Sequence, residues 1–219
     1  MPVMTREQAQ ALLQRVVKLS QADEIEVNLG ASKEDNIRFA DNRITTSGGI
    51  RDTGLSIFSA FGKRHAVTTT NDISDEGLER AVRLSEQLAR LAPENPEKMP
   101  LVGPQEYQEI DAHFESTANS TAADRARAAG MTLAAAREAG ELQAAGILLV
   151  NDRVSAMANS AGLFAYRPST SVDYTTTVRT TDGTGPGWGG TNARDWNKVD
   201  FAGATRRAVS KALLSRNPR

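Results

Sequence analysis

The stretch from Gly54 to Leu91 constrains the fold most, because strand, tight-turn, strand and helix signals follow one another without interruption. Gly62-Lys63 separates two β-rich runs, and a glycine first in a two-residue loop predicts a type II′ hairpin. Asn71-Asp72 breaks the second strand, and Ser74 is placed to cap the helix that follows. The stretch therefore predicts an antiparallel hairpin with a helix packed on it.

The spacing of apolar residues predicts which side chains of this hairpin and helix are buried. In the first strand the residues expected to share one face are Leu55, Ile57, Ser59 and Phe61. In the second strand, Arg64 to Thr70, Val67 is expected to be the main apolar anchor. The helix from Asp75 is expected to bury Leu78, Ala81, Val82, Leu88 and Ala89.

The residues before the hairpin predict a helix and two strands. An apolar stripe with helical spacing spans residues 5–19, and Thr5 and Gln8 have the spacing of a capping box. Residues 24–29 alternate as a half-buried strand, and the polar run 31–35 predicts a turn. A second strand should begin at Ile37, with an irregularity at Asp41-Asn42 and a turn or bulge at Ser47-Gly48-Gly49.

The proline-rich run after the helix predicts an extended connector, because P-E-N-P-E-K-M-P-L-V-G-P holds four prolines. We therefore expect an N-terminal domain over residues 1–97, a connector over 98–120 and a middle domain over 121–219. The fold class predicted is α+β, with two successive antiparallel-sheet units each flanked by helices.

The second half has a similar order of helix, strands and helix, without the residue-level identity of a repeat. Thr121 with Asp124 predicts a helix start, and Gly140 a helix end. The strands expected are 147–150, 154–158, 163–166 and 172–178, with turns at Asn151-Asp152 and at 159–162. A glycine loop is expected over 182–190, and Asp200 should cap a last helix buried through Phe201, Ala204, Ala208, Val209, Ala212 and Leu213. Pro218 then indicates a domain boundary or a truncation.

Composition excludes several classes of function. Lys and Arg number 26 against 27 Asp and Glu, so a net charge of −1 offers no basic surface for nucleic acid or an acidic membrane. The absence of cysteine excludes disulfides, thiol nucleophiles and cysteine metal sites, and fits a reducing cytoplasm. The N-terminus lacks a signal-peptide pattern, and no apolar run reaches the roughly 18 residues of a membrane span.

No residue stands out as catalytic, cofactor-binding or metal-ligating. His65 is interpreted as a surface histidine of a strand; His113, near Asp111 and Glu115, could make a weak metal contact but is better explained as a connector residue. Gly185, Gly187 and Gly190 spell G-x-G-x-x-G, but no helix begins there. Ser160 lacks a histidine partner, and Trp188 and Trp196 could face a ligand or, as we expect, pack on the sheet.

The run from Ala40 to Val82 resembles the N-terminal domain of the TldD/PmbA family, through its D-N-R-I turn, its short hairpin and its N-D-I-S before a helix. Leu91 to Pro96, L-A-P-E-N-P, resembles the family's exit from that helix. Val154 to Leu163, V-S-A-M-A-N-S-A-G-L, and the closing helix are similar to its middle domain.

The resemblance implies a cytoplasmic peptidase system of two similar subunits, historically called a modulator of DNA gyrase. The active subunit of such a system is a zinc metallopeptidase with an H-E-x-x-x-H helix in a C-terminal domain, and its partner lacks the metal. This sequence ends before such a helix, so no zinc ligand is assigned here and the chain alone is expected to be inactive. The expected partners are a second family member, in a homo- or heterodimer, and unfolded peptide. A non-catalytic scaffold or interaction module is the alternative.

Overall fold

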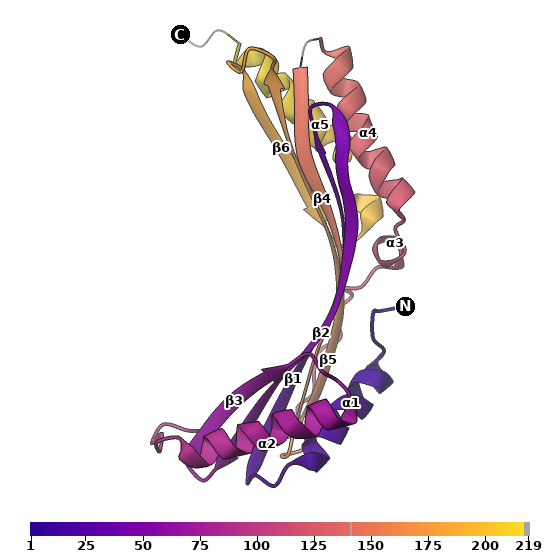
Figure 1. Ribbon diagram of the computed structural model, residues 1–219. Helices are drawn as coiled ribbons and strands as arrows, with labels where there is room; N and C mark the ends of the chain where they lie inside the picture. Colours follow the sequence, from indigo (N-terminus) through magenta and orange to yellow (C-terminus); the bar gives the residue numbers. More distant parts are fainter. Residues whose placement is uncertain (141, 217–219) are drawn as a thin grey trace. The chain divides into compact units, whose positions relative to one another are not determined.

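A computed structural model describes residues 1–140 and 142–216 (Figure 1). Its strands form one six-stranded sheet in the order β3-β2-β1-β4-β5-β6, with antiparallel pairing of β2 with β3 and of β5 with β6. Helices flank this sheet, so the predicted α+β class is confirmed. Pro218 lies outside the described residues.

The elements are α1 (Arg6–Leu19), β1 (Glu24–Ala40), β2 (Arg43–Phe61), β3 (Arg64–Thr70), α2 (Asp75–Leu91), α3 (Glu115–Ala118), α4 (Ala122–Glu138), β4 (Leu142–Asn159), β5 (Phe164–Thr180), β6 (Pro186–Ala193), the 3₁₀ turn η1 (Trp196–Lys198) and α5 (Phe201–Leu214).

The chain divides into two compact units, each built from three chain segments. Unit 1 comprises Met1–Ser32, Arg51–Asp111 and Arg153–Pro168. Unit 2 comprises Lys33–Ile50, Ala112–Asp152 and Ser169–Arg219. Strands β1, β2, β4 and β5 contribute residues to both units. The domain limits expected at residues 97 and 121 stay a prediction.

In unit 1 the helices α1 and α2 lie side by side against the strands (Figure 1). Thr5 and Gln8 form the predicted capping box at the start of α1, and the Ser74 hydroxyl accepts the Gly77 amide at the start of α2. Each buried aliphatic side chain contributes about 1.5–3 kcal/mol. The buried core comprises Ala9, Leu12, Leu13, Val16, Ile25, Val27, Leu29, Leu55, Ile57, Leu78, Ala81, Val82, Ala156 and Ala158.

Two apolar residues predicted to be buried in unit 1 are exposed. Val67 is 53% exposed, whereas its neighbour Thr68 is buried and donates its hydroxyl to the Ala81 carbonyl under α2. The prediction of which face of β3 is buried was therefore wrong. The hydroxyl of Thr68 donates a hydrogen bond to a helix carbonyl, and the valine side chain has no donor for it. Leu88 is also exposed, and Ser85 and Glu86 take the buried positions of α2.

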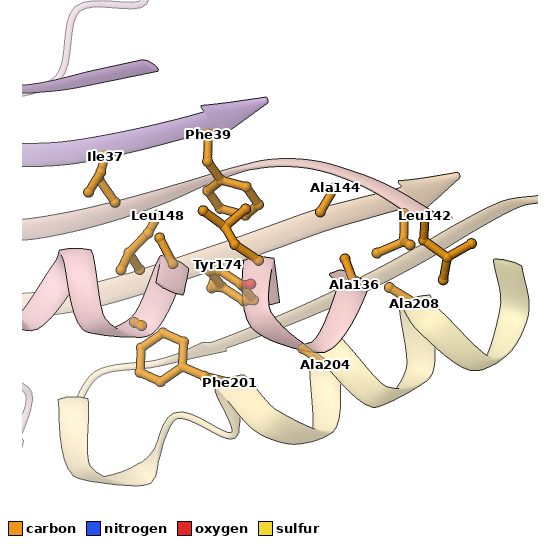
Figure 2. Packing of buried hydrophobic residues seen from close by; sticks show 14 of the residues in the cluster. Ile37, Phe39, Ala136, Leu142, Ala144, Leu148, Tyr174, Phe201, Ala204 and Ala208 are labelled. Atoms are coloured by element: carbon orange, nitrogen blue, oxygen red, sulfur yellow. The ribbon is translucent and has the colours of Figure 1, made fainter. Parts of the chain in front are cut away.

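The core of unit 2 is organised around Tyr174 on β5 (Figure 2). Its ring centroid lies 6.3 Å from that of Phe39 and 5.3 Å from that of Phe201. Its hydroxyl bonds to the Thr132 hydroxyl, which in turn lies 2.7 Å from the Thr205 hydroxyl. Burial raises the pKa of Tyr174, although these hydrogen bonds oppose the rise. A satisfied hydroxyl network thus joins α4, α5 and β5 inside an apolar core.

Several turns predicted from polar residues lie inside long strands. Residues 31–35 belong to β1, Ser47–Gly49 to β2 and Asn151–Asp152 to β4, so these turns were wrong. The true turn is Asp41-Asn42, where φ values of 49° and 56° define a type I′ hairpin between β1 and β2. Strand pairing along these segments thus outweighed their low local β-propensity.

The expected glycine loop over 182–190 is also partly wrong, because Pro186–Gly190 begin β6. The glycines allow close packing of this strand on α5: a Cβ at Gly187 would lie 2.0 Å from the Ala208 carbonyl oxygen. Asp200 caps α5 as predicted, by accepting the Gly203 amide. Of the residues predicted on the inner face of this helix, Val209 is half-buried and Leu213 is partly exposed.

Candidate functional site

A groove of about 1360 Å³ lies in unit 1. Strands β1 to β5 supply most of its lining, the first residue of α1 adds a charged group, and the connector supplies the rest. The lining residues are Arg6, Asn28, Leu29, Gly30, Gly54, Leu55, Ser56, Thr69, Thr70, Asn71, Gln105, Tyr107, Gln108, Glu109, Ile110, Ser155, Ala156, Met157, Phe164, Ala165, Tyr166, Arg167 and Pro168.

The strand lining combines core residues with small or polar neighbours. Leu29, Leu55 and Ala156 belong to the core beneath α1 and α2. Because side chains alternate across a strand, adjacent residues such as Gly30 and Ser56 point to the opposite face. The groove is thus bordered by hydroxyls and amides together with large apolar side chains such as Met157 and Phe164.

The connector is attached to unit 1 just before it reaches the groove. The Lys98 ammonium pairs with the Glu24 carboxylate, which also accepts the Leu101 amide. The Asn159 side-chain amide donates to the Val102 carbonyl at 2.9 Å. The segment 105–110 beyond these bonds is exposed to solvent. The groove therefore has a firmly held strand side and a solvated connector side.

Three charged side chains line the groove. The Arg6 guanidinium lies 5.1 Å from the centroid of the Phe164 ring, a cation–π arrangement. Arg167, on β5, is exposed, and Glu109 comes from the connector. The Tyr166 hydroxyl donates to the Met4 carbonyl, which holds the residues preceding α1 against β5.

The candidates from sequence do not assemble into a metal or catalytic centre. In unit 2 His113 lies beside Asp152, with Nε2 and Oδ1 3.2 Å apart, rather than with Asp111 or Glu115; Asp152 is buried and the His113 side chain is 10% exposed. His65 is half-buried, 5.2 Å between ring centroids from Phe58. Within residues 1–140 and 142–216 no three His, Asp or Glu side chains cluster closely enough to hold a metal. The zinc of the resembled family therefore does not fit the described residues.

The remaining candidates have structural roles. The Ser160 hydroxyl accepts the Ile25 amide at 3.2 Å, so it holds the β4–β5 turn against β1. Trp196 packs against Phe201 in the unit 2 core, as expected. Trp188 is 55% exposed, with the Lys211 ammonium 6.0 Å from its ring centroid.

Sequence reasoning missed the groove completely. Its lining comes from segments far apart in the chain, and its residue types carry no catalytic pattern. The polar, proline-free run 105–110 was the available signal, since an exposed segment of this kind borders a cavity without filling it. No helix among the described residues is both long and apolar enough to cross a membrane.

Comparison with known proteins now connects this fold to a family. The model for domain 1 of the PmbA/TldA metallopeptidases matches residues 25–89, and the model for their central domain matches residues 114–216. A search of curated proteins gives no match.

Solved structures share the fold at low sequence identity. TldE from Thermococcus kodakarensis superposes with a TM-score of 0.83 at 18% identity, over 93% of this chain and 47% of that one. A protein from Thermotoga maritima named as a modulator of DNA gyrase gives 0.79 at 12%, over 93% and 47%. One from Bacteroides thetaiotaomicron with the same description gives 0.79 at 16%, over 95% and 50%.

This chain therefore spans about half the length of the solved structures that it matches. Both family models come from one family, they match consecutive parts of the sequence, and together they cover most of it. The resemblance in the hairpin and in the second half is thereby confirmed, and the chain belongs to the TldD/PmbA family.

Proposed function

We propose that this chain is the substrate-enclosing part of a cytoplasmic TldD/PmbA-type peptidase system, and that the unit 1 groove holds an extended segment of unfolded peptide. Cleavage would be supplied by a further domain or by a partner subunit carrying zinc. A homo- or heterodimer with another family member would complete the enclosure.

The groove is the observation that carries this proposal. Its volume of about 1360 Å³ exceeds the roughly 300–1,000 Å³ of small-molecule pockets, so a longer ligand would use it better. Its lining offers hydroxyls, carboxamides and, along Phe164–Pro168 of β5, strand backbone without a β6 neighbour, which are groups that hydrogen-bond an extended peptide. Tyr107 and Met157 add apolar contact for side chains.

Filling the groove tests the proposal. Gly30 lines the groove, is exposed, and has no atom within 4 Å of a built Cβ, so Gly30→Phe should fold and occupy part of the cavity. Gly48 is likewise exposed within a strand but lies in unit 2, outside the groove, which makes Gly48→Phe a matched control.

Binding of a fluorescent, unstructured peptide is measured by anisotropy against the full chain and both variants. We expect Gly30→Phe to weaken binding about tenfold, because the ring takes the space of the peptide, while Gly48→Phe leaves it unchanged. Absence of peptide binding by the unmodified chain, or equal binding by both variants, overturns the proposal.

A further inference from the structure

We propose that Arg6 and Arg167 make the groove selective for acidic extended peptides. This inference rests on the proposed function, since it assigns a chemical preference to the same groove. It concerns specificity, and it can fail while peptide binding itself survives.

Arg6 is held in place on the face of an aromatic ring, with Glu7 as its neighbour in sequence. Its guanidinium rests over the Phe164 ring, and Phe164 in turn packs against the core of unit 1. The side chain is exposed and forms no salt bridge with a carboxylate of the described segments 1–140 and 142–216. A guanidinium stacked on an aromatic ring keeps its N–H groups free for a carboxylate, which it can bind bidentately.

Arg167 adds a second cation, from β5, the strand that also carries Phe164. Strand β6 pairs only with Val172–Arg179 of β5, so the segment Phe164–Pro168 has no β6 neighbour. Arg167 is exposed, and it too lacks a salt bridge within the part of the chain that the structure describes. A carboxylate that entered the groove would meet this side chain without displacing a partner.

The other charges of the groove do not cancel these two. Glu109 is the one acidic residue of the lining, and it comes from the exposed connector rather than from the sheet. All other lining residues are uncharged, so the groove has an excess of one positive charge. In a chain whose net charge is −1, this local excess is a property of the site and not of the whole surface.

The test uses three fluorescent peptides that differ at two positions only, carrying Asp, Asn or Lys there, titrated against the full chain. We expect the Asp peptide to bind about tenfold more tightly than the Asn peptide at low salt, and the Lys peptide to bind most weakly. The Asp preference should shrink at high salt, because exposed ion pairs are screened.

Arg6→Gln and Arg167→Gln should each weaken the Asp peptide about threefold to tenfold and leave the Asn peptide unchanged. Arg206→Gln, an exposed arginine of α5 in unit 2, is the matched control and should have no effect. Equal binding of the Asp and Asn peptides, or variants that weaken both equally, overturns the selectivity while peptide binding stands. Failure of all three peptides to bind overturns the proposed function with it.

Discussion

A Cβ atom at Gly189 of β6 would lie 2.0 Å from the carbonyl oxygen of Ala204 on α5. No real side chain tolerates that distance, so strand and helix must separate if the glycine is replaced. We expect Gly189→Ala to lower the free energy of unfolding by about 1–3 kcal/mol, measured by urea denaturation.

Gly130 provides the control for this substitution, because a Cβ there meets nothing within 4 Å and α4 is a regular helix. Gly130→Ala should raise the free energy of unfolding by up to about 1 kcal/mol, since alanine favours helix. If Gly189→Ala and Gly130→Ala change the free energy of unfolding in the same direction, this account of the packing of β6 is contradicted.

Asn42 serves both the β1–β2 turn and the first residues of β4. Its side-chain amide donates to the Leu142 carbonyl at 2.7 Å and its side-chain oxygen accepts the Ala144 amide at 2.8 Å, while its φ is 56°. Asn42→Ala loses both bonds and strains the turn, so we expect a loss of about 2–4 kcal/mol. Asn42→Gly keeps the turn geometry and should cost about 1 kcal/mol less in the same thermal or urea melt. Equal losses for the two variants would show that backbone strain contributes nothing.

The lowered pKa of Glu86 on α2 predicts that part of the free energy of unfolding depends on pH. Burial alone would raise the pKa of Glu86, but hydrogen bonds from the Gln21 amide, the Arg83 guanidinium and the Ser20 hydroxyl lower it below the ordinary value of 4.5. A carboxyl with a lowered pKa stabilises the fold above its unfolded pKa, and that contribution is lost as the pH falls through the folded value.

Glu86→Gln should therefore cost about 1–3 kcal/mol in urea denaturation at pH 7, and this cost should shrink as the pH falls through the lowered folded pKa of Glu86. Glu79→Gln, at an exposed position on the same helix, should show little change at either pH. A Glu86→Gln cost that stays constant as the pH falls from 7 across the whole acid range in which the protein stays folded would refute a role for the ionised carboxylate.

The His113–Asp152 pair predicts energetic coupling inside unit 2. Because the two side chains lie 3.2 Å apart and are little exposed, removal of either one leaves the other without its polar partner. We expect His113→Ala and Asp152→Ala to destabilise non-additively, with a coupling of about 0.5–3 kcal/mol in a double-mutant cycle. Additive losses would show that the two groups are only neighbours.

Local signals predicted α1, α2, α4 and α5 and their caps, because capping at Thr5, Ser74, Thr121 and Asp200 depends on residues within the same turn. The short helix α3, inside the connector expected to be extended, was not predicted. Strand limits failed where pairing partners from elsewhere in the chain decide them, as in residues 31–35 of β1. The glycine run was misassigned to a loop because the glycines are required by close packing against α5, an element that follows later in the chain. The groove was missed for the same cause: Gly30, Arg167 and the connector meet only in the folded unit.

The sharing of long strands between units also dictates when each unit can be completed during synthesis. Unit 1 needs Arg153–Pro168 beside its N-terminal segments, so a nascent chain that has reached Asp111 still lacks its parts of β4 and β5. Until β4 has left the ribosome, the strand β1 presents an unpaired edge, which exposes the growing chain to aggregation. Cellular production of this protein should therefore depend on chaperones that shield β1 late in translation.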